Sequence, residues 1–175
     1  MYRMKINRRQ FLAVTALTSV AGYFYYKGEK ISIYESEIQT LLAVAYHLYP
    51  SSDLGFGAKD LNLASYMTFV LQDERILQDD RDYLLRGTRW MQEHSLELTK
   101  KSFITLKSEQ KEGVIKDAVE YQWGYSYINY LFSYIFEAMF SAPVYGSNIN
   151  EMGWKFVGHQ AGFPQPQSKK DIHYV

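Results

Sequence analysis

The sequence predicts an all-α fold: a small helical domain of about five helices with an irregular Gly/Pro/aromatic C-terminal tail. Apolar residues recur three and four positions apart along most of the chain, and no sustained stretch alternates as a half-buried strand would. A length of 175 residues suits one domain that buries most of its apolar surface. We expect a signal region over residues 1–30 and the helical domain over residues 31–175.

The signal region begins with a basic segment. Arg8 and Arg9 precede Phe11 and Leu12, and residues 11–26 carry no charge and are only modestly apolar. A weak apolar run behind paired arginines resembles a bacterial twin-arginine (Tat) export signal, whereas the alternative is an ordinary signal or anchor. The run is shorter than the roughly 20 apolar residues of a membrane span. Cleavage of the signal and its retention as a membrane anchor both remain open.

The first three helices of the body are expected from their caps and apolar spacing. Ser32 and Glu35 form a capping box that opens the first helix, which Pro50 ends. Asp60 is a candidate cap for the second helix. A third, strongly charged helix is expected over residues 74–101, although its central glycine weakens it.

Two further helices follow. Ser108 is a candidate cap for a short helix that reaches about Val119, and the last helix is expected over residues 126–140. This last segment is apolar or aromatic almost all the way round, which is typical of a helix buried on every side. Either the other helices surround it, or one of its faces packs inward while the other meets a partner chain.

Composition limits the function classes. Without residues 1–22 the chain has 15 basic and 19 acidic side chains, a net charge of about −4, and no basic stripe that would bind nucleic acid. It contains no cysteine, which excludes disulfides, iron–sulfur clusters and cysteine-linked haem. Aromatic residues make up 17% of the chain, a large share that suits either a tyrosine-rich core or a partly wet interface.

No catalytic, cofactor-binding or metal-binding constellation is apparent. The four histidines are scattered, and no zinc-binding helix motif, phosphate loop or nucleophile elbow occurs. Glu137 is the carboxylate expected to be partly buried, and it suits a pairing role better than a catalytic one. His159, Asp171 and His173 are better explained as solvated tail residues than as a metal site.

The segment from Ser141 to Pro164 is the most specific in the chain. Proline and glycine indicate a turn, and a second glycine precedes a large ring and a charge. This pattern resembles the C-terminal signature of the gluconate 2-dehydrogenase subunit 3 family. The matching residues are Pro143, Tyr145, Gly146, Asn148, Gly153, Trp154, Lys155 and Gly158. Ala142 and Ser147 depart from the family's usual aspartate and glycine.

The resemblance implies a non-catalytic small subunit of a periplasmic, membrane-associated dehydrogenase. In such complexes a large subunit carries FAD and oxidises a sugar, sugar acid or polyol, and a cytochrome c subunit commonly accepts the electrons. The large subunit folds around FAD and is exported on the small subunit's signal, so Arg8, Arg9, Phe11 and Leu12 would be read by the Tat translocon. The chain itself would hold no cofactor.

The partner contacts are expected in the C-terminal signature. Their candidates are Pro143, Tyr145, Gly146, Asn148, Trp154, Lys155 and Gly158, together with the aromatic helix. The alternatives are a membrane-anchored periplasmic structural or interaction protein with no redox partner, and an independent enzyme with a site around Glu137 or the tail histidines.

Overall fold

The computed structural model describes residues 35–52 and 55–162. The twin-arginine residues Arg8, Arg9, Phe11 and Leu12, and the Ser32 cap, lie outside the described residues. The chain divides into two units, Met1–Glu37 and Ile38–Val175. Within the described residues the only β-structure is an isolated bridge between Ser52 and Gly55, so the all-α prediction is confirmed.

The helices follow the predicted order with shifted ends. Residues 35–48 are helical, and the other elements are α2 (Leu63–Gln72), α3 (Gln78–Thr99), η1 (Phe103–Thr105), α4 (Ser108–Val119), α5 (Gln122–Phe140), η2 (Pro143–Tyr145), η3 (Ile149–Glu151) and α6 (Met152–Phe156). The C-terminal segment, predicted to be irregular, therefore contains two 3₁₀ turns and a short α-helix. None of the described helices is long and apolar enough to cross a membrane.

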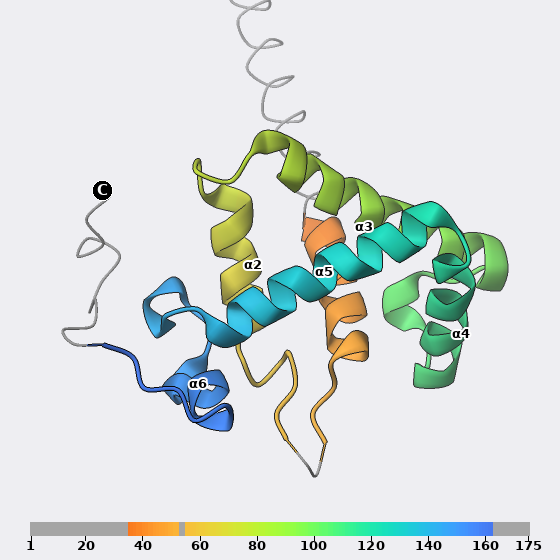
Figure 1. Ribbon diagram of the computed structural model, residues 1–175. Helices are drawn as coiled ribbons and strands as arrows, with labels where there is room; N and C mark the ends of the chain where they lie inside the picture. Colours follow the sequence, from red (N-terminus) through yellow and green to blue (C-terminus); the bar gives the residue numbers. More distant parts are fainter. Residues whose placement is uncertain (1–34, 53–54, 163–175) are drawn as a thin grey trace, which may run out of the picture. The chain divides into compact units, whose positions relative to one another are not determined.

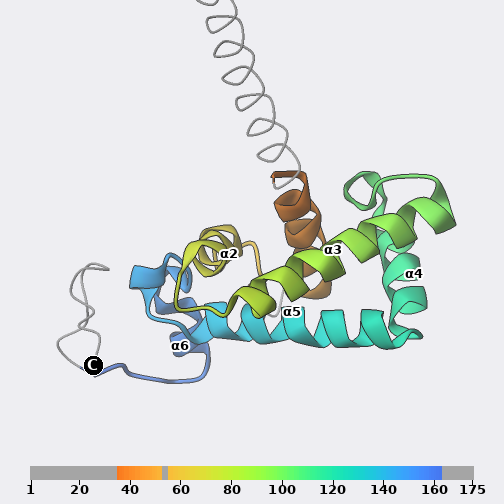
Figure 2. The ribbon, with the colours of Figure 1, turned by 90° about the horizontal axis from the view of Figure 1, so that it is seen from above.

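The long helix α5 organises the second unit. It packs against α3, against α4 near its N-terminal end, and against α2 and α6 toward its C-terminal end (Figures 1 and 2). One face of α5 supplies the core, including Tyr127, Leu131 and Ile135, which are completely buried. This face meets core residues of the other helices, such as Leu84 and Met91 of α3. The unit is therefore built on one apolar core.

Two of the predicted helix caps are wrong. Asp60 does not cap α2, because its Oδ2 accepts the Gly57 N–H at 2.8 Å and the Ser51 hydroxyl, closing the preceding loop. The helix begins three residues later, after Asn62, whose φ is 59°. Ser108 is the first helical residue of α4 rather than its cap. The backbone N–H of Lys107, the residue before it, donates to the side-chain oxygen of Gln110 at 3.2 Å.

The glycine in the middle of α3 has a packing role. Gly87 lies beneath the ring of Tyr127, and a Cβ at this position would lie 2.7 Å from Cγ of that ring. The Tyr127 hydroxyl is 3.0 Å from the Thr88 hydroxyl, and Thr88 is itself buried. The glycine that weakens α3 locally thus allows α3 and α5 to approach each other closely.

Candidate functional site

The C-terminal signature forms a compact cap on the C-terminal end of α5. The last carbonyl groups of an α-helix have no partner within the helix and must be satisfied from outside. Here the Ser147 hydroxyl donates to the Ala138 carbonyl at 2.9 Å, and the Trp154 Nε1–H donates to the Phe140 carbonyl at 2.8 Å. Ser147 is completely buried and 2.8 Å from the Ser141 hydroxyl. Ser147, where the family usually has glycine, therefore has a structural role.

Asn148 holds the two halves of this cap together. Its side-chain amide donates to the Ser141 carbonyl at 3.0 Å, and its Oδ1 accepts the Gly153 N–H at 2.8 Å. The residue is completely buried and adopts a left-handed backbone conformation with φ 51°. Asparagine tolerates that conformation better than most residues. Asn148 thus links the end of α5 to the start of α6.

Gly153 and Trp154 seat α6 against α5. A Cβ on Gly153 would lie 2.9 Å from the backbone carbonyl carbon of Met139, so only glycine fits this approach. Trp154 is 8% exposed, and its ring packs edge-to-face with His159 at 5.6 Å between ring centroids. The predicted anchor Trp154 is therefore largely used inside the chain.

Tyr145 and Gly146 lie beside α2. The Gly146 carbonyl accepts a hydrogen bond of 2.8 Å from the Asn62 side chain, and its φ of 99° favours glycine. The Tyr145 ring packs against Phe69 at 5.1 Å between centroids. Both rings border a groove that is also lined by Ser65 and Thr68. This part of the signature is half-buried and retains an accessible edge.

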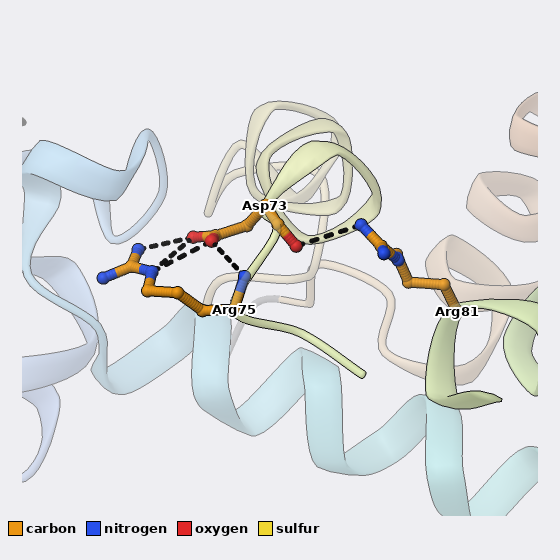
Figure 3. A network of polar contacts seen from close by, with 3 residues as sticks. All are labelled: Asp73, Arg75 and Arg81. Carbon is orange, nitrogen blue, oxygen red and sulfur yellow. Dashed lines mark hydrogen bonds and ion pairs between the residues drawn. The ribbon is translucent and has the colours of Figure 1, made fainter. Parts of the chain in front are cut away.

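A polar network continues from Phe69 into the junction of α2 and α3 (Figure 3). The Arg75 guanidinium lies 5.8 Å from the centre of the Phe69 ring, and its Nε is 2.9 Å and 3.1 Å from the two carboxylate oxygens of Asp73. From the other side, Arg81 of α3 donates to the Asp73 carbonyl at 3.0 Å. The network fixes the turn that leads from α2 into α3.

The signature also has an exposed part. Lys155 and Gly158 are exposed, and the Lys155 ammonium donates to the Asn150 carbonyl at 2.7 Å. Pro143 begins η2 and is half-buried. Two apolar side chains next to the matched residues, Phe156 and Val157, are 65% and 53% exposed. The structure therefore divides the predicted contact residues into a buried scaffold and an accessible edge.

The outer face of α5 carries an apolar surface. The sequence predicts an aromatic helix here but does not show which of its side chains are exposed. Tyr125, Phe136 and Phe140 are 59%, 50% and 44% exposed, and Phe132 stacks on Phe136 at 6.2 Å. At 100° per residue these four side chains span an arc of about 80°. We call them the α5 outer row. The α5 helix is thus not wrapped on all sides. Its free face is mixed, because the exposed polar residues Asn129, Ser133 and Glu137 lie among or beside these aromatic side chains.

The described residues hold no group of three or more metal-ligating side chains. Glu137 is exposed rather than partly buried, and it accepts a hydrogen bond of 3.1 Å from Tyr66. Burial, followed by the nearby Glu137 carboxylate, raises the pKa of Tyr66 above its ordinary value, so its hydroxyl stays protonated and donates. This pair holds α2 against α5.

Comparison with known proteins gives one result. Residues 35–162 match the family model described as gluconate 2-dehydrogenase subunit 3, so the chain belongs to this family. No curated protein and no solved structure gives a significant match. The matched range includes every helix described above and the whole cap at the end of α5, and it leaves out the signal region.

Proposed function

As a member of this family the chain is a subunit of a dehydrogenase complex, and we propose that it is the non-catalytic small subunit of an FAD-dependent enzyme of the gluconate 2-dehydrogenase type. The observation that carries the proposal is the family match over the whole helical domain. The α5 outer row supports it, because a row of exposed aromatic side chains is typical of a surface that meets another protein.

Within this proposal the large partner subunit binds FAD and oxidises the substrate, and a cytochrome c subunit accepts the electrons. The small subunit escorts the folded flavin subunit through the Tat route on its Arg8–Arg9 signal and then supports the complex at the periplasmic face of the inner membrane. The support for the export step is the sequence pattern of the signal region.

We place the partner contact on the α5 outer row and on the accessible edge of the signature, which consists of Tyr145, Lys155, Phe156 and Val157. Aromatic residues contribute most to interface energies, and a well-buried anchor contributes about 2 kcal/mol or more when truncated. The buried members Asn148 and Trp154 act by holding the end of α5, and therefore Phe140, in place.

The test is purification of the C-terminally tagged full-length chain from the native membrane fraction, followed by flavin absorbance and mass spectrometry. We expect a stoichiometric yellow partner of flavoprotein size. A colourless preparation that contains only this chain would contradict the proposal, and would favour a membrane-anchored protein without a redox partner.

The contact surface is tested with matched variants. Phe136→Ser with Phe140→Ser should reduce recovery of the flavin partner at least tenfold, because two aromatic anchors are lost. The control is Leu98→Ser with Ile104→Ser, which removes side chains of comparable exposure, 51% and 46%, from other elements. Equal recovery from both pairs would exclude the α5 outer row as the contact surface. Circular dichroism of each variant checks that the fold is intact.

A further inference from the structure

A second surface feature lies on α3, opposite the start of α5. A pocket of about 250 Å³ is lined by Trp90, Glu93, His94, Glu97 and Trp123. It contains two of the three tryptophans of the chain. None of its residues belongs to the C-terminal signature or to the α5 outer row, so the proposed partner contacts do not account for it.

The aromatic walls of the pocket stand nearly perpendicular to one another. The Trp90 and Trp123 rings are 5.9 Å apart at an angle of 67°, and the His94 and Trp123 rings are 5.6 Å apart at 77°. His94 Nε2 lies 2.8 Å from Oδ1 of Asp117, at ion-pair distance but without hydrogen-bond geometry. Three aromatic rings thus line one small volume, as they do in sites for organic cations.

The acidic side of the pocket comes from one face of α3. Glu93 and Glu97 are one helical turn apart, both are exposed, and neither has a side-chain hydrogen bond or ion pair with any residue in the described part of the chain. Like charges at this spacing repel each other. Two cations are placed beside the pocket: Arg86 lies over Trp90, 5.8 Å from its ring centre, and the Lys100 ammonium donates to the Glu97 backbone carbonyl at 3.2 Å. Neither forms an ion pair with the carboxylate of Glu93 or Glu97. A cation that enters the pocket would therefore meet two carboxylates that need a partner.

We propose that this pocket binds an arginine side chain of a partner protein. A guanidinium stacks flat on an indole ring and also donates several N–H groups to carboxylates, which matches the two kinds of wall. A quaternary ammonium has no N–H to offer Glu93 and Glu97. A lysine ammonium is a compact point charge that matches the flat aromatic walls less well. The inference does not depend on the proposed function, since the pocket can be tested on this chain alone.

The tryptophans provide the measurement. The full-length chain labelled with ¹⁵N has three indole N–H signals, assigned with Trp90→Phe and Trp123→Phe. Trp154 is the internal reference, because it is buried at the far end of α5, about 25 Å from Trp123 along the helix. The probe is N-acetyl-arginine methylamide, and its neutral counterpart is N-acetyl-citrulline methylamide at matched ionic strength. We expect the Trp90 and Trp123 signals to shift with the arginine probe, and the Trp154 signal to stay in place.

Several results would overturn the proposal. These are equal shifts with the citrulline probe, equal movement of all three indole signals, and tighter binding of tetramethylammonium, which would assign the pocket to quaternary ammonium ligands. Glu93→Gln with Glu97→Gln should weaken arginine binding about fivefold, as expected for two exposed ion pairs. The matched control, Glu74→Gln with Glu109→Gln, removes two exposed glutamates elsewhere and should leave it unchanged. An unshifted Trp154 signal in each variant reports an intact fold.

Discussion

The same substitution, glycine to alanine, should change stability in opposite directions at two positions. Gly87 is in the middle of α3 beneath Tyr127, whereas Gly113 is in the middle of α4 with no atom within 4 Å of an added Cβ. Alanine is favoured over glycine inside a helix by about 1 kcal/mol. Gly113→Ala should therefore stabilise the chain by roughly 0.5–1 kcal/mol, which raises Tm by about 1–4 °C.

At Gly87 this gain is outweighed. A Cβ there would lie 2.7 Å from Cγ and 3.0 Å from Cε2 of Tyr127. The ring cannot move away easily, because it is completely buried and its hydroxyl is 3.0 Å from that of Thr88. Overpacking of this kind costs about 1–3 kcal/mol, and losing the hydroxyl contact costs about 1 kcal/mol more. After the helix gain is subtracted, Gly87→Ala should destabilise the chain by about 1–3 kcal/mol.

The assay is thermal and urea unfolding of both variants, followed by circular dichroism at constant protein concentration. Gly87→Ala should lower Tm by about 2–12 °C while Gly113→Ala raises it. The steric cause is tested by Tyr127→Leu, which removes the ring, since the penalty of Gly87→Ala should then shrink by 1 kcal/mol or more. If Gly87→Ala is as stabilising as Gly113→Ala, the close packing of α3 on α5 is refuted.

Three further predictions concern loops and the cap of α5. The Gly57 N–H and the Ser51 hydroxyl lower the pKa of Asp60 in the folded chain. The stability that these contacts provide is therefore present above the unfolded pKa of about 4 and is lost as the pH falls through the lower folded pKa. Asp60→Asn should flatten the dependence of Tm on pH below about pH 4, measured by thermal unfolding. Asn148→Ala removes two hydrogen bonds of a buried side chain and should cost about 2–4 kcal/mol in urea unfolding, whereas Asn150→Ala, at an exposed neighbour, should cost less than 1 kcal/mol. Gly153→Ala places a Cβ against the Met139 carbonyl group, 2.9 Å from its carbon, and should detach α6, which increases the exposure of Trp154 to a fluorescence quencher. Gly162→Ala, with open space around it, should not.

The sequence predicted the helices well because their apolar periodicity is local. Their ends depended on contacts that sequence spacing does not contain. Asp60 was a good candidate cap by residue type, but the chain folds back and brings Gly57 and Ser51 to its carboxylate first. From the sequence alone, Gly87 is a weak point in α3. Its packing role depends on Tyr127, forty residues later in the chain, which only the folded structure places against it.

The candidate site was predicted only in part, because the sequence does not show which of its residues are buried. The C-terminal signature was identified from its residues, but a tryptophan and an asparagine in a loop are consistent with either a surface anchor or an internal brace. Burial separates these roles, and Trp154 at 8% and Asn148 at 0% exposure act as braces. The pocket between Trp90 and Trp123 was not identified, since its residues lie 33 positions apart and form no motif. The available signal in the sequence is a helical spacing that places four residues of the pocket on one face of α3, namely Trp90, Glu93, His94 and Glu97.

The buried part of the signature and the exposed contact surface are mechanically linked. Trp154 donates its indole N–H to the carbonyl of Phe140, and the side chain of that same residue ends the α5 outer row. Helix ends fray unless their last carbonyls are satisfied, so without the cap Phe140 would not be held in line with Phe136. Keeping Phe140 in the same row as Phe132 and Phe136 requires a helix that stays ordered to its last turn. In this chain the signature residues therefore provide the rigidity, and the helix they cap provides the surface that we propose for partner binding.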